Sequence, residues 1–459
     1  MKPLTLLPEG ARGVAPRLPR LLRWGKTLSK FVVVQVVVQA VGVASGILLV
    51  RTLSRTEYAF FTLAFAMQST MSILADSGVG IGLASIGGRV WQDPRRFGQL
   101  VATALGLRRR LAAIAVLAVA PLLVWLLWTN GASTSYALLL TLLVLVGLSF
   151  QLTTVVLMVV PRLRSQLGRV QAIDLVGALA RLALVAAAYF IFLNAAVATA
   201  ATAASVLAQY LLLKRWTPDS IDAAAQPSAL DRAEMRSIIK SQVPNSVFYC
   251  LQGQVTVWLV ALFGSTQSIA EVGALGRLGV VFAVVGAVMT SIVLPGFARC
   301  QSPDVLRRRY LQIMGASVFI ALSVVALARL FPDQLLWVLG AKYSHLRDAL
   351  LLTMTLTAFG GVITMMWALN STKAWIRHSW LNIPAVLVTQ ALLLSFLNIS
   401  TLEGVLWFGI LSLVPTLLLN AMLSYRGLTG CGHLAGHPAE GLLDEPSATT
   451  ASALAEHRQ

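Results

Sequence analysis

Long apolar stretches separated by short polar ones dominate the sequence. Twelve can be traced, at residues 31–50, 58–86, 111–128, 136–160, 171–193, 196–213, 243–263, 272–297, 311–331, 348–370, 380–398 and 404–424. Each is close to the ~20 residues that a transmembrane α-helix requires, and none shows the strict alternation of a barrel strand. Backbone polar groups in lipid must be paired within the protein. The pattern therefore predicts an all-α integral membrane protein with about 12 transmembrane helices.

The composition agrees with burial in lipid rather than in water. Hydrophobic residues make up 57% of the 459 residues and charged residues 12%, about half of the ~25% typical of soluble domains. The net charge of +18 would suggest nucleic acid as the partner of a soluble protein. Here most basic residues fall in short polar segments, so we expect contact with membrane lipid and not with nucleic acid. No P-loop, nucleophile elbow or zinc signature is recognisable, so we expect no enzyme activity, cofactor or metal.

The distribution of basic residues predicts the orientation of the chain in the membrane. If the N-terminus is cytoplasmic, the inner segments carry 29 of the 36 Lys and Arg residues, whereas the outer loops carry only Arg51, Arg55, Lys342 and Arg347. Cytoplasmic loops of membrane proteins are enriched in Lys and Arg. We therefore expect a multi-pass protein with both termini in the cytoplasm.

The polar segments divide the chain into five parts. Residues 1–30 form a basic tail, and residues 214–240 form a polar cytoplasmic linker between a first half, 31–213, and a second half, 241–424. Each half contains six apolar stretches. Residues 425–459 are rich in Gly, Pro, Ser, Thr and Glu, a composition that predicts a disordered cytoplasmic tail.

A short motif recurs in the two halves. Ser54 and Glu57 open the second apolar stretch, and Ser268 and Glu271 open the eighth. Ser-x-x-Glu before an apolar run is typical of a capping box, in which Ser is the N-cap of a helix. Because six is even, both halves would enter the membrane from the same side. The repeat thus predicts two six-helix bundles in a parallel pseudo-repeat around a central cavity.

Charged residues that fall inside apolar stretches include Asp76, Asp174, Arg181 and Arg277, and Arg329 lies near the end of another stretch. A charge near the bilayer centre costs about 2.5–3.5 kcal/mol on insertion scales, so each requires a reason. An Arg facing an aqueous cavity would bind an anionic headgroup, with a carboxylate to tune or gate it. The alternative is a structural ion pair, or an acid close enough to the interface to be hydrated. For Arg277 we favour a functional role, because it has no acid within a turn on its own helix face.

Amides are the other unusual intramembrane groups. Gln35 and Gln39 are spaced i, i+4 in the first stretch, and Gln252 and Gln254 lie in the seventh, after Pro244. Such amides could hydrogen-bond to a sugar in a polar cavity. They could equally join neighbouring helices, at about 0.6 kcal/mol each.

Several segments resemble Wzx-type polysaccharide flippases, members of the multidrug/oligosaccharidyl-lipid/polysaccharide (MOP) exporter superfamily. Residues 51–58 (RTLSRTEY), followed by an aromatic-rich span ending in residues 76–80 (DSGVG), resemble the opening of that family. Pro244, residues 272–278 (VGALGRL) and residues 339–343 (LGAKY) are similar to its second-half pattern. The likeness extends from residue 25 to about residue 425.

The resemblance implies a V-shaped pair of six-helix bundles around a cationic cavity in a bacterial inner membrane. It implies translocation of an undecaprenyl-pyrophosphate-linked oligosaccharide repeat unit from the cytoplasmic to the periplasmic leaflet, for exopolysaccharide, capsule or O-antigen biosynthesis. H⁺ or Na⁺ would be the coupling ion, and a polymerase and other polysaccharide assembly proteins would be partners. By position, the pyrophosphate ligands would be Arg277, Arg181 and Arg51, the glycan ligands Gln35, Gln39, Gln252 and Gln254, and the coupling or gating residues Asp76 and Asp174.

The sequence departs from the family at two places. Ala59 stands where the family usually has Gly, and Gln252 and Gln254 stand where many relatives have an Asp. A cation-coupling role of that Asp therefore does not carry over to this chain.

Three other functions are compatible with the sequence. A drug/cation antiporter of the MATE type would favour an acidic cavity, whereas the intramembrane charges here are three Arg and two Asp. A membrane-embedded glycosyltransferase, polymerase or ligase would need a large outer loop, and the longest one expected is 332–347, with His345 as a lone catalytic candidate. A non-transporting scaffold in a polysaccharide assembly complex is the third.

Overall fold

The computed structural model describes residues 17–434, apart from 165, 220, 223, most of 280–301, 374 and 376–378. The described helices are α1 (Arg17–Thr52), α2 (Arg55–Asp76), α3 (Val79–Val90), α4 (Pro94–Thr129), α5 (Thr134–Leu163), α6 (Leu167–Ile191), α7 (Ala195–Trp216), α8 (Ala229–Phe263), α9 (Thr266–Gly276), α12 (Pro303–Leu330), α13 (Pro332–Leu339), α14 (Arg347–Thr372), α15 (Asn382–Phe396), α16 (Leu402–Ser412) and α17 (Val414–Leu434). Within this part of the chain, eleven segments are long and apolar enough to cross a membrane. The expected span at 272–297 lies largely outside the described residues. The prediction of an all-α membrane protein with about 12 helices is confirmed.

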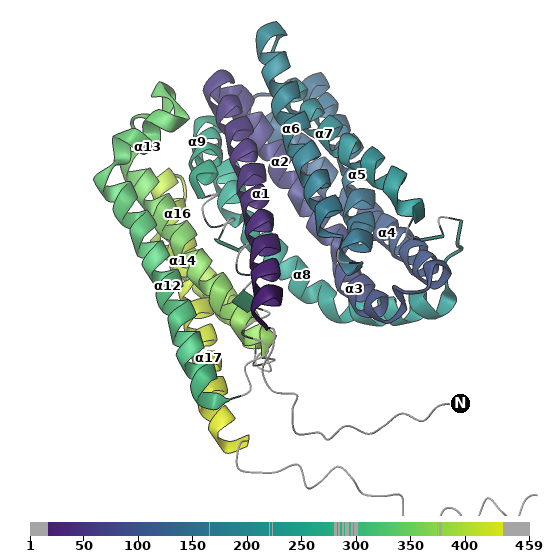
Figure 1. Ribbon diagram of the computed structural model, residues 1–459. Helices are drawn as coiled ribbons and strands as arrows, with labels where there is room; N and C mark the ends of the chain where they lie inside the picture. Colours follow the sequence, from purple (N-terminus) through teal and green to yellow (C-terminus); the bar gives the residue numbers. More distant parts are fainter. Residues whose placement is uncertain are drawn as a thin grey trace, which may run out of the picture.

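Most helices of the two halves lie on either side of α1, whereas α8 of the second half lies beside α3 of the first. In Figure 1, α12, α13, α14, α16 and α17 are on the left and α2–α7 on the right, with α9 between the two groups. The first turns of α1 and the last turns of α17 lie at the same end of the molecule. We call this the linker end, because the segment between α7 and α8 also lies there, and we call the opposite end, where α1 meets α2, the closed end.

Three polar segments differ from the sequence prediction because helices extend into them. α1 begins at Arg17, so residues 17–30 are helical rather than a simple tail. α8 begins at Ala229, inside the expected linker. α17 continues to Leu434, where disorder was expected from residue 425, and residues 435–459 lie outside the described part. A helix that leaves the apolar layer can continue into water, because its hydrogen bonds are internal, so hydropathy marks the span and not the helix end.

The apolar stretch expected at 58–86 is two helices. α2 ends at Asp76 and α3 begins at Val79. Between them, Ser77 has φ 27° and Gly78 has φ 96°, a left-handed conformation that favours glycine. A Cβ on Gly78 would also lie 2.9 Å from Cβ of Gln242 on α8. The break therefore depends on Gly78 both for its backbone conformation and for the close approach of α8.

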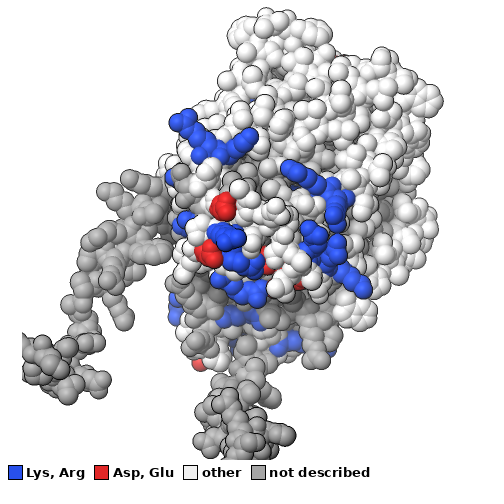
Figure 2. All heavy atoms as spheres, turned by 90° about the vertical axis from the view of Figure 1, so that its right-hand side faces the viewer, with Lys and Arg blue, Asp and Glu red and all other residues white. Residues whose placement is uncertain are grey.

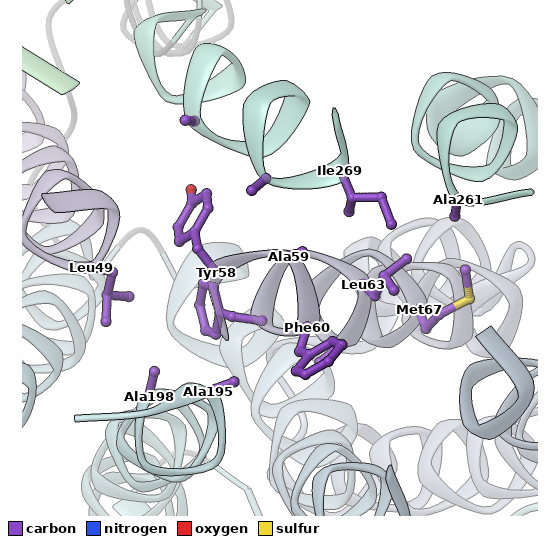
Figure 3. Packing of buried hydrophobic residues seen from close by; sticks show 14 of the residues in the cluster. Leu49, Tyr58, Ala59, Phe60, Leu63, Met67, Ala195, Ala198, Ala261 and Ile269 are labelled. Atoms are coloured by element: carbon purple, nitrogen blue, oxygen red, sulfur yellow. The ribbon is translucent and has the colours of Figure 1, made fainter. Parts of the chain in front are cut away.

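Apolar packing joins the two halves at the closed end. There a single cluster of buried side chains includes residues from α1, α2, α4, α5 and α7 of the first half and from α8, α9, α14 and α16 of the second. Figure 3 shows α2 at the centre of this cluster, with Leu63 facing Ile269 of α9 and Ala195 of α7 on the opposite side. Towards the linker end, the described buried residues form separate clusters, one around Phe97 and one around Phe297.

The linker end is basic and is attached to the first half. Figure 2 shows Lys and Arg gathered over the middle and lower part of one face, while its upper part is almost free of charge. Arg96 of α4 forms two hydrogen bonds with Asp231 of α8, at 3.0 and 3.2 Å, and Asp231 is 3% exposed. Arg89 pairs with Glu234. The first turns of α8 are therefore held against α3 and α4.

Candidate functional site

Two of the predicted arginines meet at the seam between the halves. Arg181 lies on α6, and Arg277 begins a 3₁₀ turn (Arg277–Gly279) directly after α9. Arg181 and Phe65 of α2 line the same cavity, and the Arg277 guanidinium lies over the Phe65 ring. Arg277 Nε donates a hydrogen bond to the Tyr58 hydroxyl on α2, at 3.3 Å. Residues far apart in the sequence thus form one cationic group between α2, α6 and α9.

Arg277 lies flat against the first half of the chain. Its guanidinium carbon is 5.5 Å from the centre of the Phe65 ring, within the range of a cation–π contact. On α1, a Cβ at Gly46 would approach Arg277 Cδ to 3.2 Å. Gly46 therefore allows the arginine side chain to pass directly over the backbone of α1.

Arg181 lines an open cavity of about 330 Å³ between α1, α2, α5, α6 and α7. Its Nε and Nη2 atoms are buried and have no hydrogen-bond partner among the described residues. A buried guanidinium without an acceptor is costly. An anion entering the cavity would supply the missing acceptors, so Arg181 has the environment expected of a ligand-binding residue.

The cavity also contains amides, most of which the sequence prediction missed. Gln39 lines it, as expected, and Gln35 is half-buried one turn earlier on α1. Gln68, Gln151 and Gln209 line it as well. Gln68 Nε2 donates to Gln151 Oε1 at 3.0 Å. Each of these three glutamines is the only amide side chain within a long apolar helix. An isolated amide in an apolar stretch is the sequence feature that could have identified them.

The predicted amides of the second half have other positions. Gln252 of α8 exchanges two hydrogen bonds with Gln390 of α15, at 3.0 and 2.7 Å. Gln252 therefore joins two helices, which was the alternative interpretation. Gln254 is half-buried on the same helix.

Arg51 lies at the closed end, away from the cavity. Its Nε and Nη2 donate to the carbonyls of Val338 and Trp337, at 2.9 and 2.6 Å. Nearby, Lys342 Nζ donates to the carbonyls of Arg51 and Leu53, at 3.0 and 2.5 Å. Arg55 Nη2 donates to the Lys342 carbonyl at 2.5 Å. These three residues, the three-cation cluster (Arg51, Arg55 and Lys342), bind backbone carbonyls across the two halves.

Both predicted acids lie beside arginines. Asp76 pairs with Arg108 of α4 at 3.1 Å, and the Arg108 side chain is 3% exposed. Asp174 is attracted by Arg162 of α5. Within the described lining of the cavity, α6 contributes Gly177 and Arg181 but not Asp174. Asp76 therefore has the ion-pair partner that the structural interpretation requires.

The N-cap predicted from the Ser-x-x-Glu motif is confirmed in the first half of the chain and wrong in the second. Ser54 accepts a hydrogen bond from the Glu57 backbone and is the N-cap of α2, as predicted. The N-cap of α9 is Ser265 and not Ser268. The two carboxylates also act elsewhere: Glu57 accepts hydrogen bonds from the Tyr136 hydroxyl and the Ala195 backbone at the start of α7. Glu271 lies 3.1 Å from His345 Nε2. The motif located the helix starts to within three residues.

Comparison with known proteins decides the fold. Neither a family model nor a curated protein matches the sequence. Solved structures do match, among them the inward-facing conformation of a multidrug resistance MATE family transporter of the MOP superfamily. That match has a TM-score of 0.66 and 18% identity, over 88% of this chain and 99% of that one. The chain has the MATE transporter fold.

Other MATE structures agree. A MATE protein in complex with MaD3S gives a TM-score of 0.60 at 19% identity, over 88% of this chain and 96% of that one. The outward-facing conformation of a MATE family transporter gives 0.59 at 17% identity, over 88% and 95%. The MOP-type fold that the sequence resemblance implied is confirmed, and the Wzx subtype stays a prediction.

The described residues adopt one conformation of the MATE fold. The halves share a core at the closed end and have separate cores towards the linker end. The charge bias predicts that the linker end is cytoplasmic.

Proposed function

We propose that this protein is a flippase for an undecaprenyl-pyrophosphate-linked oligosaccharide in a bacterial inner membrane. The supporting observation is that Arg181 lines a cavity with many polar side chains, and that Arg277 of the other half lies over the ring of Phe65, which lines the same cavity. Substrate would enter from the cytoplasmic leaflet, and rocking of the halves would expose it to the periplasm for polysaccharide biosynthesis.

The arginine pair fits a pyrophosphate. Guanidinium groups bind phosphate oxygens by two parallel hydrogen bonds, and the bonds are strong because both partners are charged. A pyrophosphate between Arg181 and Arg277 would neutralise two charges that otherwise repel each other. Because the two arginines belong to different halves, the substrate would also bridge the parts that move during transport.

The fold is shared with multidrug resistance transporters, so a drug/cation antiporter is the main rival. A cationic drug would be attracted by a carboxylate in its cavity. Arg181 is the one charged side chain among the described residues that line this cavity, and its charge is positive. This lining favours an anionic substrate.

An embedded polymerase or ligase has weaker support. His345, its candidate catalytic residue, faces Glu271 at the closed end, away from the arginine pair. We retain Asp76 and Asp174 as proposed gating or H⁺/Na⁺-coupling residues, which would act by exchanging their arginine partners during the transition.

Transport of the lipid-linked glycan in proteoliposomes tests the proposal. Arg277→Ala and Arg181→Ala should each lower the initial rate at least tenfold, because a hydrogen-bonded charge contributes about 1.5–3 kcal/mol. Arg329→Ala, which removes an exposed arginine of α12, is the matched control and should transport normally. Undiminished transport by Arg277→Ala at equal protein level would refute the assignment of the pyrophosphate site.

A further inference from the structure

The cavity of the first half has the chemistry of a sugar-binding pocket. We propose that it recognises one sugar residue of the glycan, and that Gln68, Gln151 and Gln209 determine which sugar is accepted. This inference rests on the proposed flippase function and adds to it a location and a set of residues. It places glycan recognition in the first half of the chain alone.

Many of the residues that line the cavity carry polar side chains. Eight of its fourteen described lining residues carry polar side chains, including four glutamines, Ser69, Thr202 and Ser205. Pockets for drug-like molecules are mostly apolar, with few polar groups, and span about 300–1,000 Å³. A cavity of about 330 Å³ is near the lower limit of that range. Its size and polarity fit a single hydroxyl-rich ring better than a large apolar cation.

The hydrogen bonds already formed leave both donors and acceptors for a ligand. The Gln68–Gln151 bond uses the Gln68 amide nitrogen and the Gln151 carbonyl, so the Gln68 carbonyl and the Gln151 amide nitrogen can bond a ligand. Gln209 Nε2 donates to the Ile173 carbonyl at 3.2 Å, which leaves its own carbonyl as an acceptor. Sugar hydroxyls donate and accept, and therefore match this mixed set.

Glycines place two of these amides. A Cβ on Gly177 of α6 would lie 2.1 Å from Gln209 Nε2, and a Cβ on Gly147 of α5 would lie 3.4 Å from Gln68 Nε2. Gln209 of α7 thus crosses the backbone of α6 at Gly177, a position without a side chain. Any larger residue at Gly177 would displace the Gln209 amide from the cavity.

Aromatic and cationic groups lie at one side of the pocket. Phe65 lines the cavity, and the residue is 44% exposed. Its ring therefore offers a flat apolar surface to the C–H face of a sugar. The same ring lies under Arg277, and Arg181 lines the cavity itself. A pyrophosphate held by the two arginines would therefore place an attached glycan beside the glutamines.

Ligand-observed saturation-transfer NMR with the purified full-length protein in nanodiscs tests the pocket. The probes are free glucose, galactose and N-acetylglucosamine, each at millimolar concentration, without lipid or pyrophosphate. At least one should bind, and Gln209→Leu and Gly177→Val should weaken that binding about tenfold, as expected for the loss of a buried hydrogen-bonding group. Gln312→Leu, a change at an exposed amide of α12, should bind like the wild type.

Thermal unfolding of each variant identifies any that is misfolded, and Gln209→Asn provides a milder second change at the same site. Absence of binding by the wild type, or equal binding by the folded Gln209 variants, would overturn the proposal even if the lipid-linked glycan is transported. Sugar binding that depends on Gln209, combined with no transport of the lipid-linked glycan, would support the pocket and refute the proposed flippase function.

Discussion

The Arg277 side chain donates its Nε hydrogen to the Tyr58 hydroxyl at 3.3 Å, and this bond joins the two halves of the chain beside the cavity. Tyr58 is fully buried, and its charge environment also includes Arg181. The phenol therefore orients the cation that we assign to the substrate. Any movement of the halves must break or rotate this contact.

Replacing Tyr58 by Phe should weaken the binding of inorganic pyrophosphate about fivefold, because the ring keeps its packing while one hydrogen bond of ~1 kcal/mol is lost. Calorimetric titration of the purified protein measures the change. Tyr189→Phe, at an exposed position of α6, is the control. An equal or higher affinity in Tyr58→Phe would mean that the hydroxyl competes with the ligand for Arg277.

Removing the ammonium group of Lys342 should favour separation of the two halves at the closed end, where the three-cation cluster lies. Lys342→Met would remove the donor that bonds the carbonyls of Arg51 and Leu53. We expect faster thiol labelling of a cysteine introduced at buried Leu53. Arg347→Met is the control, since Arg347 pairs with Asp333 of the same half. Unchanged labelling in Lys342→Met would exclude a closing role for this contact.

The same cluster predicts a dependence on pH. Burial, and then the charge of Arg55, lowers the pKa of Lys342 from 10.5. A group whose pKa is lower in the closed than in the open conformation binds fewer protons when closed, so the closed conformation gains stability as the pH rises. Labelling of the Leu53 cysteine, corrected for thiolate reactivity with an exposed reference cysteine, should slow as the pH rises towards 10.5. Faster corrected labelling would contradict the sign.

The Asp76–Arg108 ion pair should stabilise the conformation described here. Asp76→Ala leaves the almost fully buried Arg108 without its carboxylate. The free energy of unfolding should fall by at most about 3 kcal/mol, the low end for breaking a buried pair. The effect is limited because the Asp76 side chain is 37% exposed. The double variant Asp76→Ala with Arg108→Met should unfold at a higher temperature than Asp76→Ala alone. Equal melting temperatures of the two variants would indicate that Arg108 finds another partner.

The packing of α2 against α9 should require a glycine. A Cβ on Gly273 would lie 2.3 Å from Thr62 Oγ1 and 2.8 Å from its Cγ2. Gly273→Ala should therefore separate the halves and increase labelling at the closed end, and Thr62→Ala in the same chain should restore part of the wild-type behaviour. Gly276→Ala, where a Cβ would meet no atom within 4 Å, is the control. Failure of Thr62→Ala to compensate would show that the backbone adjusts.

The sequence by itself determined that this protein lies in lipid, where most of its spans fall along the chain, and which orientation is expected. Lipid requires about 20 apolar residues for each helix and excludes unpaired backbone groups, and both constraints act locally along the chain. It also marked Arg181 and Arg277 as exceptional, because a charge inside an apolar stretch stands out without any knowledge of its neighbours.

Only the tertiary structure decided which polar groups share a site. It placed Arg181 and Arg277 near the same ring, that of Phe65. It paired Gln252 with Gln390, and it placed Arg51 at the closed end. It also brought Gln68, Gln151 and Gln209 into one cavity. Hydropathy gives the existence of a helix but not its rotation or its neighbours. An intramembrane glutamine therefore looks the same in the sequence whether it joins two helices or faces a ligand, and the packing of the helices selects between the two.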